Sequence, residues 1–122
     1  MKKILVVEDV EFNRDLIVQL LEEDYDVVTA VDGDEGVRRA ERDRPDLILM
    51  DLSLPVVDGW EATRRIKANE TLRHIPIIAL SAHAMVGDEE RARQSGCDDY
   101  ISKPLNEEVL FEKLKRLFGT AG

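Results

Sequence analysis

Short apolar runs alternate with amphipathic stretches along the whole chain. Aliphatic and β-branched runs predict five short strands, at residues 4–7, 27–31, 46–50, 77–80 and 99–102. Apolar residues at helical spacing, or polar helix formers after a turn signal, predict five helices, at residues 11–23, 34–43, 60–68, 88–95 and from 107 onward. Residues 1–122 are therefore expected to form a single domain with no output domain.

Strict alternation of strands and helices favours one fold class. Five strands separated by helices predict an α/β protein, in which a doubly wound parallel sheet is covered on both faces. Crossovers between parallel strands are right-handed, and ligands bind beyond the carboxyl ends of the strands. The side chains that follow each strand are therefore the first candidates for a functional site.

Polar residues stand at four of these strand ends. Glu8 and Asp9 follow the first run, Asp51 the third, Ser81 the fourth and Lys103 the fifth. In a parallel sheet these ends share one edge, so the five side chains are expected to converge there.

Their chemistry suits a phosphoryl-accepting site. Adjacent carboxylates at Glu8 and Asp9 repel each other, and magnesium would relieve this with oxygen ligands, although a solvated acidic turn is also open. Asp51 can act as a nucleophile toward phosphorus and form an acyl phosphate. The carbonyl of Ser53 would complete the metal's ligands.

Ser81 and Lys103 would contact the phosphoryl oxygens. The Ser81 hydroxyl can donate to one of them, but serines are also common in loops. The flexible ammonium of Lys103, beside Pro104, reaches a phosphate or the Asp51 carboxylate as a point charge. A cis bond before Pro104 is left open.

Composition and charge narrow the class of partner. The hydrophobic content is 43% and the formal net charge is −9, which disfavours nucleic acid and anionic membranes as partners. No apolar run is long enough to span a bilayer, and the start is not a signal peptide. The single cysteine, Cys97, fits a reducing cytoplasm.

The ordered motifs resemble a known family. Together they resemble the receiver domain of two-component response regulators over essentially the whole chain: Glu8-Asp9, Met50-Asp51, Pro55, Asp58-Gly59, Ser81-Ala82 and Tyr100-Ile101-Ser102-Lys103-Pro104. The segment at residues 81–85 is similar to single-domain regulators of the DivK type and to receivers of hybrid kinases. The resemblance implies a flavodoxin-like sheet in the order 2-1-3-4-5.

The resemblance also implies a metal site and a phosphoacceptor. Asp51 would take the phosphoryl group from a phosphohistidine, giving 4-aspartylphosphate in a phosphorelay. Asp9 and Asp51 would ligate Mg²⁺ directly, Glu8 would act through water and Ser53 through its carbonyl. Mn²⁺ could substitute.

Further residues are implied to read the phosphoryl group. Ser81, Lys103 and the backbone amide of Ala82 would bind its oxygens. Ser81 and Tyr100 would form the switch, although Tyr100 taken by itself is an ordinary edge-strand aromatic. Ser53 and His83 would tune the lifetime of the phosphorylated state.

The partners implied are proteins. A histidine kinase or histidine phosphotransfer protein would dock on a rim formed by Val10, Phe12, Asn13, Ile17, Met85, Pro104 and Leu105, unless Phe12 and Ile17 belong to the core. A downstream protein would read the fourth helix, fifth strand and fifth helix, which also offer a weak dimer surface to an otherwise monomeric protein. The chain would be a cytoplasmic phosphoacceptor, with only self-catalysed phosphotransfer and autodephosphorylation.

Three alternatives differ from this interpretation. A receiver cut from a hybrid kinase competes with a free-standing regulator, which the start of the chain and its short tail favour. A phosphohydrolase of the haloacid dehalogenase kind would need a second aspartate at position 53, where this chain has Ser53. A flavodoxin-like electron carrier would need a hydroxyl-rich loop where Glu8 and Asp9 stand.

Overall fold

Strands and helices alternate in the structure as they do in the sequence pattern. The computed structural model describes residues 1–81 and 87–119. Within these residues the elements are β1 (Lys3–Val7), α1 (Glu11–Leu21), β2 (Asp26–Ala30), α2 (Gly33–Asp43), β3 (Leu47–Asp51), α3 (Gly59–Ala68), β4 (Ile77–Ser81), α4 (Asp88–Gln94), β5 (Asp99–Ser102) and α5 (Glu107–Phe118).

The strands form one parallel sheet. Their order in the described residues is β2-β1-β3-β4-β5, which confirms the predicted topology. At its carboxyl end β1 lies between its two neighbours, so that Val7 pairs with Ala30 of β2 and with Met50 of β3. The order of the strands reverses at this point, and the crevice beyond it is where doubly wound sheets bind ligands.

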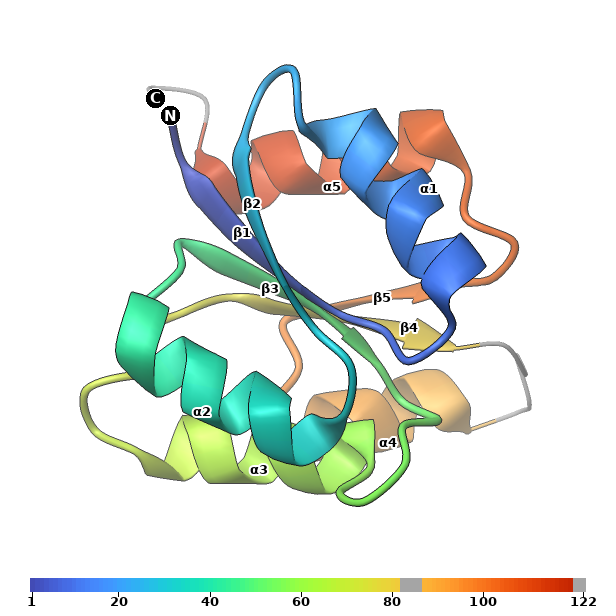
Figure 1. Cartoon of the computed structure of the whole chain (residues 1–122). Helices are drawn as coiled ribbons and strands as arrows, with labels where there is room; N and C mark the ends of the chain where they lie inside the picture. The colour runs from blue at the N-terminus through green and yellow to red at the C-terminus, as the bar shows by residue number, and fades with distance from the viewer. Residues whose placement is uncertain (82–86, 120–122) are drawn as a thin grey trace.

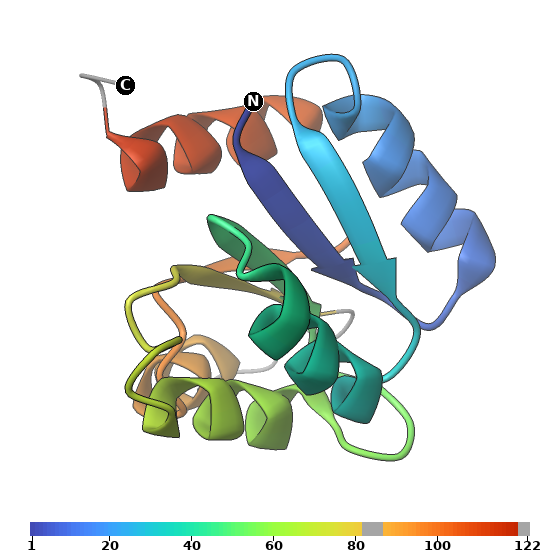
Figure 2. The same cartoon turned by 60° about the vertical axis from the view of Figure 1, so that its left-hand side comes forward.

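Two helical layers enclose the sheet. Helices α1 and α5 cover one face, and α2, α3 and α4 cover the other (Figure 1, Figure 2). Alternating residues of β1 feed the two cores: Ile4 and Val6 belong to the cluster under α1 and α5, whereas Leu5 and Val7 belong to the cluster under α2–α4. All four side chains are fully buried, which gives β1 the continuous apolar run seen in the sequence.

Side chains cap three of the helices at their amino ends. Asp32, Asp58 and Asn106 each accept a hydrogen bond from the backbone amide three residues further on, at the starts of α2, α3 and α5. Such a cap contributes about 1 kcal/mol. The predicted cap at Asn106 is confirmed.

Element ends differ from the prediction by one or two residues. Helix α1 ends at Leu21 instead of residue 23, because the amides of Asp24 and Tyr25 both donate to the Leu21 carbonyl and close a turn. Strand β2 spans 26–30 instead of 27–31, which leaves Val31 exposed. Strand β3 begins at Leu47 and includes Asp51, and α4 ends at Gln94.

The helices are short. In the described part of the chain, none is both long enough and apolar enough to cross a bilayer.

Candidate functional site

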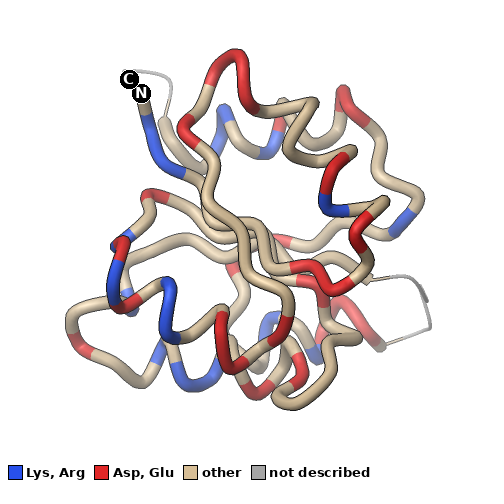
Figure 3. The backbone as a smooth tube through the Cα atoms, viewed as in Figure 1, with Lys and Arg blue, Asp and Glu red and all other residues tan. Residues whose placement is uncertain are grey.

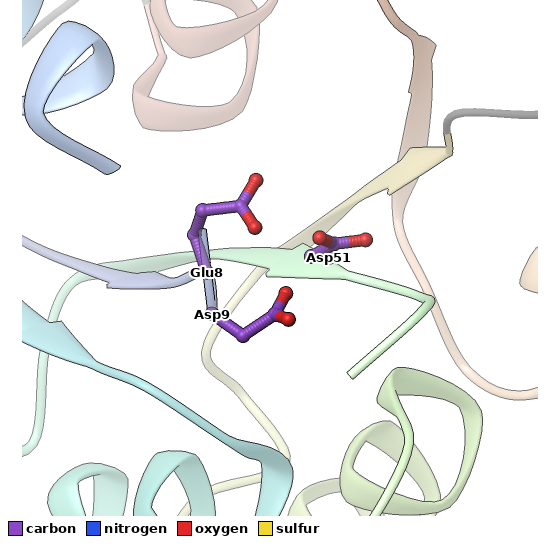
Figure 4. Close-up of side chains that lie close together, drawn as sticks. All are labelled: Glu8, Asp9 and Asp51. Atoms are coloured by element: carbon purple, nitrogen blue, oxygen red, sulfur yellow. The ribbon is translucent and has the colours of Figure 1, made fainter. Parts of the chain in front are cut away.

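Three carboxylates converge at the carboxyl edge of the sheet. Glu8 and Asp9 follow β1 and Asp51 ends β3, and one carboxylate oxygen from each lies within 4.8 Å of the others (Figure 4). They meet because β1 and β3 are hydrogen-bonded neighbours whose last paired residues are Val7 and Met50. The predicted convergence of the acidic pair with Asp51 is confirmed.

Lys103 joins the cluster from the far strand. Its Nζ lies 2.7 Å from Glu8 Oε1 and 3.1 Å from Asp51 Oδ2. The Lys103 backbone amide donates to the Ser81 carbonyl at 2.7 Å, which holds the end of β5 beside the end of β4. The Lys103–Pro104 peptide bond is cis.

The charge balance at the site is negative. Burial raises the pKa of Glu8 to about 7, with the neighbouring Asp51 acting in the same direction, although Lys103 and the Val10 amide oppose the rise. Burial alone would lower the pKa of Lys103, but Glu8 and Asp51 outweigh it and the pKa is raised. Three carboxylates cluster here and one ammonium contacts two of them, so a hard divalent cation with oxygen ligands fits this donor set.

The backbone holds Asp51 firmly. The Ser53 amide donates to Asp51 Oδ1 at 3.0 Å, while Lys103 holds Oδ2. Only 5% of the Asp51 side chain is exposed. Gly59, the first residue of α3, packs so closely that a Cβ there would lie 2.1 Å from the Asp51 carbonyl oxygen. Helix α3 therefore sets the position of the Asp51 main chain.

The other predicted residues are distributed around this cluster. Ser81 is buried at the end of β4 and Ser53 is exposed after β3. Ala82 and His83 lie outside the described residues. Tyr100 is half-buried in β5 beside Ala79, and its hydroxyl is buried with no hydrogen-bond partner in the described part of the chain. Its ring therefore lies inward.

Sequence reasoning missed one contact of the β1–α1 loop. Arg14 on α1 donates from Nη1 to the carbonyl oxygens of Glu8 and Asp9, at 3.0 and 3.5 Å. A polar residue on the first turns of a helix gives no local signal of such a contact.

Comparison with known proteins identifies the family. A family model described as the response regulator receiver domain matches residues 4–115. The chain belongs to this family. It is the receiver domain of a response regulator, a signalling domain of two-component systems, and phosphotransfer is the general function of such domains. This membership decides against the phosphohydrolase and electron-carrier alternatives.

Relatives of two kinds are equally similar in sequence. The chain is 46% identical to the polar-differentiation response regulator DivK of Brucella anthropi over 121 residues, which cover 98% of each chain. It is also 46% identical to the receiver domain of the sensor histidine kinase PA1611 from Pseudomonas aeruginosa, with a TM-score of 0.90 and coverage of 97% and 98%. That structure has a magnesium ion coordinated in its active-site cleft.

A third relative was solved together with a partner. The receiver domain of Ssk1 from Saccharomyces cerevisiae was co-crystallised with the histidine phosphotransfer protein Ypd1. The chain is 32% identical to it with a TM-score of 0.85, covering 92% of this chain and 85% of that one.

Proposed function

We propose that Asp51 is the phosphoacceptor of this receiver domain. The supporting observation is the placement of its carboxylate at the switch point of the sheet, where it contacts the Lys103 ammonium at 3.1 Å and has an oxygen within 4.8 Å of oxygens of Glu8 and Asp9. An Asp51 oxygen attacks the phosphorus of a phosphohistidine, the P–N bond breaks and the imidazole nitrogen keeps the electron pair. The product is an acyl phosphate on Asp51 and a neutral histidine on the donor.

Magnesium is the proposed cofactor. Asp9, Asp51 and the carbonyl of Ser53 would ligate it, with Glu8 acting through water, and Mn²⁺ would substitute because it also prefers oxygen ligands. When bound, the metal neutralises charge on the incoming phosphoryl group. The pKa of Glu8, raised by burial and by Asp51, supports a site that needs a cation.

Lys103, Ser81 and the Ala82 amide are the proposed contacts to the phosphoryl oxygens. Lys103 is already within 3.1 Å of Asp51, so it can follow the transferred group with little movement. Ser53 and His83 would tune hydrolysis of the acyl phosphate, and the chain would have no other catalytic activity.

The switch would pass from Ser81 to Tyr100 and on to the surface of α4, β5 and α5. Phosphorylation adds close to two negative charges and three acceptors at one point, so Ser81 and Lys103 would gain hydrogen bonds that the bare carboxylate cannot fully supply. Only such differential contacts shift a population between two states. This surface would bind a downstream protein, or a second copy weakly in an otherwise monomeric protein.

The proposed docking site for the phosphodonor is a groove beside α1. The groove has a volume of about 930 Å³ and lies between α1 and the residues after β5. Its apolar lining includes Phe12, Leu16, Leu20, Pro104 and Leu105. Phe12 is 71% exposed, whereas Ile17 is buried and belongs to the core. Met85 lies outside the described residues.

Other exposed apolar side chains surround the carboxyl edge of the sheet. Val10, Val31 and Val56 stand in the loops after β1, β2 and β3, and all are exposed. An apolar rim around an acidic pocket suits a helical bundle that presents a histidine. The Ypd1 complex of the Ssk1 receiver supports a histidine kinase or a histidine phosphotransfer protein as the donor.

We infer a cytoplasmic location for the protein. The buried Cys97, which forms no disulfide, supports this inference.

The decisive experiment is labelling of Asp51→Asn. Wild-type protein, Asp51→Asn and the control Asp24→Asn are incubated with a small phosphodonor and with purified histidine kinases of the source organism. Asp24 is an exposed aspartate in the α1–β2 turn, so its substitution makes the same chemical change away from the site. We expect Asp51→Asn alone to lose the acyl phosphate, measured by intact mass. Full labelling of Asp51→Asn would refute the assignment.

A further inference from the structure

Arg14 contacts the backbone of the loop that carries two of the three clustered carboxylates. It lies in the first half of α1, and its Nη1 donates to the Glu8 carbonyl at 3.0 Å and to the Asp9 carbonyl at 3.5 Å. The side chain is half-buried. It therefore crosses back over the β1–α1 loop and ties the start of the helix to the end of the strand.

Arg14 donates to carbonyl groups, although many carboxylates lie nearby. Arg14 is the only basic residue between Glu8 and Asp24, and Figure 3 shows how acidic this part of the chain is. Arg14 nevertheless makes no ion pair within the described residues, whereas Arg38 and Arg65 pair with carboxylates on their own helices. Its guanidinium is thus available to the loop backbone.

Asp9 is the member of the cluster that depends most on this backbone. Lys103 and the Val10 amide hold the Glu8 carboxylate, and Lys103 and the Ser53 amide hold that of Asp51. The Asp9 carboxylate is exposed and accepts no hydrogen bond from the described residues. Its position relative to Glu8 and Asp51 therefore follows from the path of its main chain.

We propose that Arg14 is a positioning residue for the metal site, which it serves by fixing the main chain of Glu8 and Asp9. The proposal rests on the magnesium site proposed above. Groups that orient a metal ligand raise metal affinity because the ligand is ordered before the ion arrives. Arg14 acts through the two carbonyls and touches neither the ion nor the phosphoryl group.

The charge of Arg14 would have the opposite effect. A guanidinium near the cluster repels a divalent cation, so removing the charge alone would strengthen Mg²⁺ binding. Removing a positioning contact would weaken it. The sign of the change in Mg²⁺ affinity therefore separates the two roles.

The test is isothermal titration of Mg²⁺ into wild-type protein, Arg14→Ala, Arg14→Lys and Arg38→Ala. We expect Arg14→Ala to raise the dissociation constant about tenfold. Arg14→Lys keeps the charge without the planar fork, so its dissociation constant should lie between those of wild type and Arg14→Ala. Arg38→Ala removes the same charge from an exposed ion pair on α2, and its Mg²⁺ affinity should match that of wild type.

Two further measurements exclude a general loss of structure. In urea denaturation without metal, the unfolding free energy of Arg14→Ala should be nearly that of wild type. If Arg14→Ala does not fold, Arg14→Gln replaces it in every measurement. At saturating Mg²⁺, a small phosphodonor should label Arg14→Ala at the wild-type maximal rate, because only metal binding is impaired. Unchanged or tighter Mg²⁺ binding by Arg14→Ala overturns the proposal. A wild-type protein that binds no Mg²⁺ refutes the metal site itself.

Discussion

The ammonium of Lys103 lies 2.7 Å from the carboxylate of Glu8, although 95 positions separate the two residues. They come from the ends of β5 and β1, which are not adjacent in the sheet. Two strands therefore separate them, and both side chains must extend over the edge of the sheet to meet. Since Lys103 also contacts Asp51, its ammonium bridges the carboxylate of Glu8 and that of the proposed phosphoacceptor.

Stability without metal should depend on the ionisation of Glu8. Its pKa is about 7 in the folded protein and 4.5 without the protein's influence, so between these pH values the folded state binds more protons than the unfolded chain. The stability associated with protonated Glu8 is therefore lost as pH rises across this window. We expect urea denaturation in a chelator to show lower stability at pH about 8 than at pH about 5.5.

Glu8→Gln is the matched variant for this pH effect. It keeps the size of the side chain and removes the titration, so the fall in stability toward high pH should shrink. Mg²⁺ should also bind wild type more tightly above pH 7 than below it, because the ion competes with the proton. An equal pH slope for the two proteins would contradict the assignment to Glu8.

Gly59→Ala should disturb Asp51 directly. The added Cβ would lie 2.1 Å from the Asp51 carbonyl oxygen and 2.7 Å from the Leu52 Cα, and these are backbone atoms that cannot rotate away. We expect a loss of about 1–3 kcal/mol in unfolding free energy, with slower labelling of Asp51 by a small phosphodonor. Gly87→Ala is the control, because it meets no atom within 4 Å and carries only the strain of a φ of +95°. Normal labelling of folded Gly59→Ala would show that this packing does not set Asp51.

Val56→Asn should stabilise the protein. Val56 is 83% exposed and has a φ of 67°, a left-handed conformation that β-branched residues rarely adopt. Asparagine tolerates this conformation, so relief of strain should add about 0.5–1 kcal/mol to the unfolding free energy measured in urea. Val31→Asn replaces an exposed valine whose φ is not positive, and it should give no such gain.

Asp15→Lys should slow phosphotransfer from a protein donor and leave small-molecule labelling unchanged. Asp15 is exposed on α1, the helix that lines the docking groove, and no described residue forms an ion pair with it. It lies four residues after Glu11, so the substitution replaces a like-charge pair with a favourable one. The helix should therefore remain at least as stable.

The expected effect is electrostatic. At about 50 mM salt we expect kcat/KM for the fastest kinase donor to fall about threefold to tenfold, and the difference should shrink at about 0.5 M salt. Glu41→Lys makes the same charge change on α2, behind the opposite face of the sheet, and should transfer normally. If both variants behave alike, the groove is not the docking site.

The sequence by itself determined the elements and the edge at which function is located. Apolar runs such as residues 4–7 predict buried strands, and their alternation with helices favours a parallel sheet, so Glu8, Asp51 and Lys103 were expected at one edge. Turn and cap residues such as Asn106 marked helix starts for local reasons. The order of the strands and the role assigned to Tyr100 depended on resemblance to a family.

Only the tertiary structure decided which atoms meet. Glu8 is buried and Asp9 exposed although they are adjacent in the loop after β1, and this difference depends on how the loop packs against the rest of the protein. Three further contacts depend on how whole elements pack. They are the ion pair of Lys103 with Glu8, the packing of Gly59 on Asp51 and the hydrogen bonds of Arg14 to two carbonyls. Hydrophobic periodicity specifies which face of an element is buried, but the distances between side chains of different elements arise only when the core is packed.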